Sequence, residues 1–167
     1  MEYRIRQAVA GDAAAINRLC VEAYQEYEVA VGRANWEQMQ VILSRTADLS
    51  KSGELLLAED EEGILGVVLY IPPGKSDGVI IPKEWASIRT LAVSPKSRGR
   101  GIGKRLTQEC INRAIQDGAA AIGLTTSEMM QIALPMYERM GFHRETELEP
   151  RLGAKLARYV LQLKPSA

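Results

Sequence analysis

The sequence of 167 residues has little of several features on which protein functions often depend. It contains two cysteines and one histidine, too few for a disulfide framework or for a metal site built from those ligands. We expect Cys20 and Cys110 to be free, buried thiols in helical segments. The 21 Lys and Arg residues balance the 21 Asp and Glu residues, and this zero net charge argues against a nucleic-acid-binding protein, which normally carries a basic excess.

Targeting and membrane-spanning patterns are also missing. Residues 1–6 alternate in the manner of a strand and have no apolar h-region, so no signal peptide is predicted. No apolar run approaches the roughly 20 residues of a membrane-spanning helix. We therefore expect a cytoplasmic protein that binds neither nucleic acid nor membrane. The 46% hydrophobic and 25% charged residues suit an ordinary globular chain, and we expect one domain over residues 1–167.

Hydrophobic periodicity predicts an alternation of strands and helices. The predicted strands cover residues 3–9, 54–59, 64–71, 85–93, 121–125, 142–147 and 157–163. The predicted helices cover residues 35–49, 102–117 and 132–140, together with a first helix that has Asp12 as its N-cap and an apolar stripe reaching Tyr24. The last two strands are expected to pair antiparallel. This order predicts an α/β fold in which helices cover a mixed sheet.

The most informative segment is the loop between the strand at 85–93 and the helix at 102–117. It consists of Arg98, Gly99, Arg100, Gly101, Ile102, Gly103 and Lys104. Glycine permits a positive φ and leaves no Cβ in the way, so successive N–H groups can form a concave nest. The start of the helix adds free N–H donors and the positive end of its dipole, and the basic side chains add charge. Together these features predict an anion site suited to a pyrophosphate.

Two other phosphate-binding loops fit this segment less well. A P-loop needs a glycine, then four residues, then Gly-Lys-Ser/Thr. Counting back from Gly103 and Lys104, that glycine falls on Arg98, and Arg105 stands where Ser or Thr is needed. A Rossmann fingerprint that starts at Gly99 would need its third glycine at position 104. A glycine-rich turn with a solvated basic rim remains the alternative from these residues alone.

This loop and a second motif together resemble the GNAT (GCN5-related N-acetyltransferase) superfamily. Arg98, Gly101 and Gly103 fill the fixed positions of its coenzyme A motif, R/Q-x-x-G-x-G/A. Residues 133–142, ALPMYERMGF, resemble the A-x-x-x-Y-E-x-x-G-F signature of the helix and strand that follow. The resemblance covers nearly the whole chain. It implies a mixed, mostly antiparallel sheet with a splayed parallel strand pair, flanked by helices.

The resemblance also implies a reaction. A GNAT protein transfers the acetyl group of acetyl-coenzyme A, without a metal, to a primary amine of a small molecule or protein by direct attack in a ternary complex. The pantetheine arm would pair with the backbone of Leu91, Ala92 and Val93, and the pyrophosphate would bind the amides of residues 98–104. The Leu91 N–H would stabilise the developing oxyanion, and the Tyr137 hydroxyl would protonate the departing thiolate.

The general base does not follow from the resemblance. Ser87 stands where many members have a glutamate, and a serine cannot act as a base at neutral pH. Deprotonation through ordered water to Glu84 or Glu128, or an amine that arrives neutral, remain the alternatives. We expect His143, directly after the glycine–phenylalanine signature, to be structural. The missing glutamate keeps open a second reading, a non-catalytic acyl-coenzyme A binding or sensing module.

We expect the acceptor site to be formed by the first two helices, the segment that connects them and the loop at 72–85. Acidic and aromatic side chains there would suit a cationic amine through charge pairing and cation–π contact. The candidates are Tyr24, Tyr27, Glu28, Tyr70, Asp77 and Trp85. The alternative is that the aromatic residues belong to the core. A polyamine, an aminoglycoside, an amino-acid derivative and a protein amino terminus all remain open as acceptors, and a homodimer is common among similar proteins.

Overall fold

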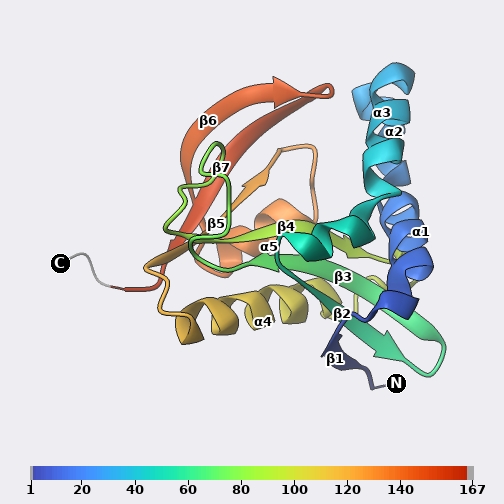
Figure 1. Ribbon diagram of the computed structural model, residues 1–167. Helices are drawn as coiled ribbons and strands as arrows, with labels where there is room; N and C mark the ends of the chain where they lie inside the picture. The colour runs from blue at the N-terminus through green and yellow to red at the C-terminus, as the bar shows by residue number, and fades with distance from the viewer. Residues whose placement is uncertain (1, 165–167) are drawn as a thin grey trace.

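The computed structural model describes residues 2–164 and centres on a seven-stranded sheet (Figure 1). The strand order is β1–β2–β3–β4–β5–β7–β6. The strands are β1 (Arg4–Gln7), β2 (Glu54–Asp60), β3 (Gly63–Ile71), β4 (Ala86–Val93), β5 (Ala121–Thr126), β6 (His143–Arg151) and β7 (Ala154–Gln162). The β4–β5 pair is parallel and the other neighbouring pairs are antiparallel. The predicted α/β fold with a mixed, mostly antiparallel sheet is confirmed.

Helices cover both faces of this sheet. The helices are α1 (Ala13–Tyr24), α2 (Glu28–Val31), α3 (Arg33–Leu43), α4 (Ile102–Gln116) and α5 (Ala133–Arg139). Short 3-10 turns lie at Ala10–Asp12, Gln25–Tyr27, Thr46–Lys51 and Pro95–Ser97. In the described part of the chain, no helix combines the length and the apolar character needed to cross a membrane.

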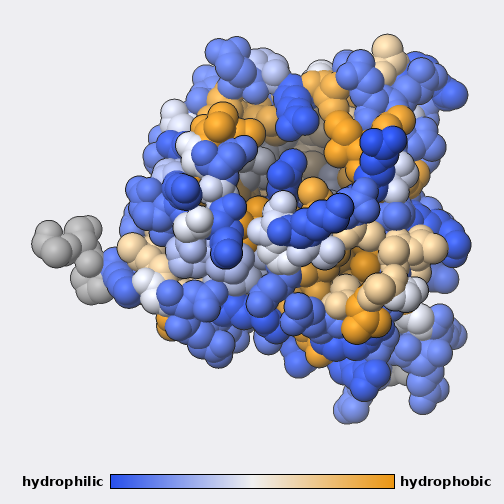
Figure 2. Space-filling view, viewed as in Figure 1, coloured by the Kyte–Doolittle hydropathy of each residue, from blue (hydrophilic) through white to orange (hydrophobic). Residues whose placement is uncertain are grey.

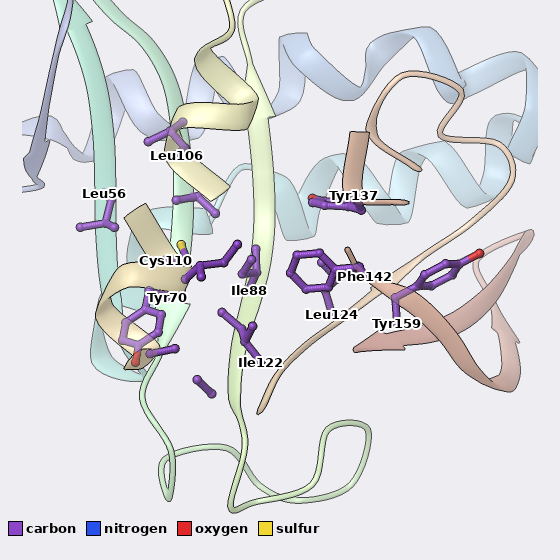
Figure 3. Packing of buried hydrophobic residues seen from close by; sticks show 14 of the residues in the cluster. Leu56, Tyr70, Ile88, Leu106, Cys110, Ile122, Leu124, Tyr137, Phe142 and Tyr159 are labelled. Carbon is purple, nitrogen blue, oxygen red and sulfur yellow. The ribbon is translucent and has the colours of Figure 1, made fainter. Parts of the chain in front are cut away.

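The core has two parts because β2, β3 and β4 bury side chains on both faces. Alternate residues of β2 show the division: Leu56 packs with α4 and α5, and Leu57 packs with α1 and α3. Figure 3 shows the first part, in which Leu106 and Cys110 of α4 lie against the sheet. Cys20 and Cys110 are both free and buried, as predicted. A strand that is buried on both faces reads as a continuous apolar run.

One predicted helix differs from the structure at both of its ends. The helix predicted at 35–49 starts at Arg33 and ends at Leu43, and a 3-10 turn follows. The hydroxyls of Ser44 and Thr46 each donate a 2.7 Å hydrogen bond to a carbonyl three residues earlier, which competes with helix continuation. Asp12 is the N-cap residue of α1, as predicted, but its side chain accepts the N–H of Val9 and pairs with Arg6 and caps no donor of α1.

The β6–β7 hairpin is longer than predicted and reaches the helices. The predicted strands at 142–147 and 157–163 do pair antiparallel, but the hairpin extends to a turn at Leu152 and Gly153. A Cβ on Gly153 would lie 2.7 Å from the side-chain nitrogen of Asn35 and 2.8 Å from the oxygen of Val31. The turn therefore lies against α2 and α3, and the hairpin arches over one face of the sheet (Figure 1).

Candidate active site

The two parallel strands separate soon after they begin to pair. β4 and β5 match only at Ala86 with Ile122 and at Ser87 with Gly123, and beyond these pairs each strand continues without the other. Thr90 of β4 has a φ of +55°, which is rare for a β-branched residue, and the register with β3 shifts beside it. This bulge redirects β4 and leaves a gap between the strands.

A cavity of about 470 Å³ opens at this gap. Leu91, Ala92 and Val93 of β4 form one side, and the glycine loop with the first turn of α4 forms another. Tyr24 at the end of α1 and Tyr27 in the 3-10 turn after it contribute aromatic rings. The remaining wall is mostly apolar: Met130, Ile132, Ala133, Met136 and Met140. The volume and the lining are typical of a small-molecule site.

The glycine loop has the backbone that its sequence predicts. Gly99 and Gly101 have φ values of +82° and +76°, and α4 starts directly after Gly101. A Cβ on Gly103 would meet Leu91, Val93 and Met136 at 3.6–3.8 Å, so the helix start approaches β4 closely. Free N–H groups at the start of α4 therefore border the cavity.

The basic side chains of the loop differ in their surroundings. Arg98 is paired with Glu26 and donates a 3.0 Å hydrogen bond to the oxygen of Ala23, so it ties the loop to the end of α1. Arg100 pairs with Asp60 at 3.4 Å and lies over the ring of Tyr3. It does not line the cavity. Lys104 lines the cavity. Arg98 and Arg139 line it too, so three basic side chains, one of them paired with Glu26, border the cavity beside the backbone amides.

Tyr24 joins α1 to the central strand. Its hydroxyl donates a 2.8 Å hydrogen bond to the backbone oxygen of Leu91, and its ring meets the ring of Tyr27 edge-on at 5.8 Å. Burial raises the pKa of Tyr24, and the nearby phenol of Tyr137 raises it further. Tyr24 is thus protonated at neutral pH and fixes the position of Leu91.

Tyr137 is not part of the cavity lining, although Met136 and Met140 on either side of it are. Its side chain on α5 is 5% exposed, and its ring meets Phe142 edge-on at 5.7 Å. Figure 3 shows the Tyr137 hydroxyl directed toward β4. Burial is the largest cause of its raised pKa, and the Tyr27 phenol is a further cause. The hydroxyl is therefore protonated at neutral pH and close to Tyr24 and Tyr27.

Several residues predicted for the acceptor site lie elsewhere. Tyr70 is fully buried in the core on the α4 side of the sheet, and its hydroxyl donates a 2.7 Å hydrogen bond to Asp117, so it cannot line an acceptor site. Glu28 pairs with Arg33 at 3.1 Å. Asp77 accepts the N–H of Val79 at 2.9 Å within its own loop. These three residues are not part of the cavity lining.

Trp85 and the candidate bases also lie outside the cavity lining. Trp85 covers Gly123 of β5. Ser87 is 3% exposed within the short parallel pairing. Glu84 is exposed, and Glu128 borders a separate polar hollow of about 180 Å³. Within residues 2–164, no three His, Cys, Asp or Glu side chains gather closely enough to hold a metal ion.

The sequence analysis missed part of the lining. Met130, Met136 and Met140 supply the flexible apolar wall, and Ser97 and Glu26 border the loop. The methionines recur near the predicted last helix, which was a usable signal. That the wall faces the glycine loop depends on tertiary packing, and no local pattern encodes it.

Comparison with known proteins identifies the family. The family model of the acetyltransferase (GNAT) family matches residues 14–142. The chain belongs to this family, and the resemblance drawn from the two motifs is confirmed.

Individual relatives are more distant. The chain is 28% identical over 116 residues to N-acetyltransferase 8F1 of Rattus norvegicus, a match that covers 65% of this chain and 51% of that protein. The chain thus spans about half the length of that relative. It is also 28% identical over 142 residues to the uncharacterized N-acetyltransferase YhfO of Bacillus subtilis, over 85% of this chain and 91% of that protein.

Solved structures have the same fold. The chain resembles a GNAT family acetyltransferase from Brucella melitensis that was solved in complex with acetyl-CoA. The TM-score is 0.69 at 22% identity, and the match covers 99% of this chain and 91% of the other. At this identity the likeness establishes the architecture, including the mixed sheet with one parallel pair.

Proposed function

We propose that this protein is an N-acetyltransferase that transfers the acetyl group of acetyl-coenzyme A to a primary amine. The observation that carries the proposal is the continuity of the cavity. It borders the glycine loop, Leu91 to Val93 in the part of β4 beyond its last pair with β5, and the apolar wall at residues 130–140. Such a channel suits a ligand with a polyanionic end and a long, narrow arm that ends in a thioester.

The residues present fit that ligand. The positive φ values at Gly99 and Gly101 and the start of α4 provide a cradle for a pyrophosphate, and Lys104 adds a cation. The methionine-rich wall suits the apolar parts of the arm. When bound, acetyl-coenzyme A supplies an activated acyl carbon. The chain positions that carbon, accommodates the charge on its oxygen and manages the protons.

Two groups of the chain would act on the reacting atoms. Leu91 lines the cavity and its oxygen is held by Tyr24, and its N–H is the donor that would stabilise a developing oxyanion. The protonated hydroxyl of Tyr137 can donate a proton to the thiolate as the carbon–sulfur bond breaks.

The amine would have to reach the cavity in its neutral form. Among the described residues that line the cavity, Glu26 is the one carboxylate, and it is already paired with Arg98. An ammonium has no lone pair with which to attack a carbonyl. We therefore propose that the ammonium loses its proton to solvent before attack, without a dedicated carboxylate base.

The same lack of a free carboxylate favours a second candidate function, an acyl-coenzyme A binding module without catalysis. One experiment separates the two: acetyl-coenzyme A is mixed with a panel of primary amines, and released thiol is followed with a thiol reagent. Amine-dependent release that saturates with amine and scales with protein concentration supports the acetyltransferase. Tight binding of acetyl-coenzyme A with release no faster than the amine-free control would contradict it and favour the binding module.

A further inference from the structure

Arg89 occupies an unusual place in the middle of the central strand. It pairs with Leu69 of β3, and Leu69 belongs to the core beneath α1 and α3. Residues that oppose each other in an antiparallel pair project on the same face of the sheet. The Arg89 side chain therefore lies on the α1 and α3 face, and its neighbour Ile88 packs on the other face with α4.

Arg89 is exposed, although the residues before it in β4 are buried. Within residues 2–164, it makes no hydrogen bond, ion pair or ring contact. Other arginines of the fold are engaged: Arg113 pairs with Glu54 at 2.8 Å, and Arg158 pairs with Glu145 at 2.8 Å. A lone guanidinium in a central strand is thus a charged group without a protein partner.

The position of Arg89 is at the opening of the β4–β5 gap. Two residues before Arg89, Ser87 forms the last β4–β5 pair with Gly123. Trp85 covers Gly123. On the other side of Arg89, Tyr24 holds the oxygen of Leu91. Arg89 therefore lies between the covered part of the sheet and the proposed reaction centre.

The surroundings leave room for a ligand on this face. The turn of the β6–β7 hairpin lies against α2 and α3, and Figure 2 shows the surface hollowed between the hairpin and these helices. Arg89 itself does not line the cavity that the glycine loop borders. An acceptor can enter through this hollow while acetyl-coenzyme A occupies the side of the glycine loop.

We propose that Arg89 binds a carboxylate of the acceptor, so that the acceptor class is amino acids and amino-acid derivatives with a free carboxylate. This inference rests on the proposed acetyltransferase function and names its substrate class. The planar guanidinium matches a carboxylate with two parallel hydrogen bonds. Residues 89 and 91 lie roughly 7 Å apart along the strand, a separation that an α-amine, its carboxylate and the arginine side chain together span.

The ion pair would also help the chemistry. A carboxylate next to an amine stabilises the ammonium, and neutralising that carboxylate lowers the pKa of the amine. The neutral nitrogen forms the bond to the acetyl carbon, the carbon–sulfur bond breaks, the nitrogen loses one proton and the thiolate gains one. A cation beside the cavity thus suits a site whose one lining carboxylate, among the described residues, is already paired.

The test compares amino acids with their carboxamides as acceptors at pH 8 and saturating acetyl-coenzyme A. With the carboxyl group blocked, an α-amine titrates near 7.7–8.0, so the carboxamide holds the larger neutral fraction and any preference for the acid reflects carboxylate binding. We expect the wild-type protein to favour the acid by about tenfold or more in kcat/KM. In Arg89→Ala the ratio of acid to carboxamide should fall to about one, and Arg89→Lys should keep part of the preference.

Arg18→Ala is the matched control, because Arg18 is an exposed arginine of α1 that makes no hydrogen bond, ion pair or ring contact within residues 2–164. It should keep the wild-type ratio. The affinity for acetyl-coenzyme A and the Tm show whether each variant is folded. If Arg89→Ala is not folded, Arg89→Gln replaces it in the comparison. Equal use of acid and carboxamide by the wild type, or an unchanged ratio in the Arg89 variants, would overturn this inference alone. Binding of acetyl-coenzyme A without turnover of any amine would overturn the proposed function as well.

Discussion

The hydroxyl of Tyr24 donates a 2.8 Å hydrogen bond to the backbone oxygen of Leu91, which fixes the end of α1 to the central strand at the edge of the gap. The contact links a side chain from the start of the chain to the strand edge on which the proposed oxyanion donor lies. Because both groups are partly buried, the bond also resists rearrangement of the cavity.

Tyr24→Phe should therefore affect both stability and function. Loss of one hydrogen bond, with the Leu91 oxygen left without it, should lower the free energy of unfolding by about 1 kcal/mol. The KM for acetyl-coenzyme A should rise because Leu91 is less well fixed. Urea unfolding and steady-state kinetics measure the two effects. Tyr159→Phe is a suitable control, since Tyr159 is a buried tyrosine of β7 outside the cavity lining. A Tyr24→Phe protein with wild-type stability and KM would show that the contact has no role.

Gly101→Ala should weaken coenzyme A binding by at least about tenfold. Gly101 has a φ of +76° and open space at its Cβ position, so alanine adds backbone strain of about 1 kcal/mol and a methyl group beside the nest. Isothermal titration with acetyl-coenzyme A measures the affinity.

Gly74→Ala is the matched control for this change. Gly74 has a φ of +88° and equally open space, but it is not part of the cavity lining. Both variants should lose similar stability, and only Gly101→Ala should lose affinity. Equal affinities in the two variants would contradict the assignment of the loop to the pyrophosphate.

Tyr137→Phe should lower kcat at least tenfold and leave the affinity for acetyl-coenzyme A near that of the wild type, because general acids typically contribute about 10²–10⁴ in rate. The hydroxyl is protonated at neutral pH, since burial raises its pKa. Stopped-flow release of thiol measures the chemical step. An unchanged kcat would mean that water or another group protonates the thiolate.

Acid should destabilise the protein through Asp12. The hydrogen bond from Arg6, with a second from the N–H of Val9, lowers the pKa of Asp12 from 3.8 to about 2. The unfolded chain therefore binds the proton first as the pH falls, so this stabilisation is full above about pH 4 and disappears as the pH approaches 2. Urea unfolding of wild type and Asp12→Asn should differ most at neutral pH and converge near pH 2. A constant difference across this range would contradict the linkage.

Local patterns in the sequence predicted the strands, the long helices and the glycine loop. These patterns involve only residues that are neighbours in the sequence, such as the alternation in the hairpin strands and the three glycines before residue 104. They can therefore be recognised without tertiary information. The end of α3 at Leu43 depends on two hydroxyls that bond back to the chain, and apolar periodicity does not show this.

The site was harder to predict than the fold. Tyr70 and Tyr24 look alike in sequence, but they lie on opposite faces of the sheet, and only Tyr24 reaches the cavity. Arg98 fills a motif position, yet its partner Glu26 comes from a segment 72 residues away. Which face a strand residue presents, and which distant side chain meets it, are set by the packing of the whole sheet.

The most direct measurement is a thermal-shift titration with acetyl-coenzyme A, with ATP and NAD as controls. A ligand that binds only the folded protein stabilises it by about 2.7 kcal/mol at one hundred times its Kd. We predict a rise in Tm that grows with the logarithm of the acetyl-coenzyme A concentration and does not occur with ATP or NAD. No rise with acetyl-coenzyme A, or an equal rise with ATP, would contradict the assignment of the glycine loop and the β4–β5 gap to coenzyme A.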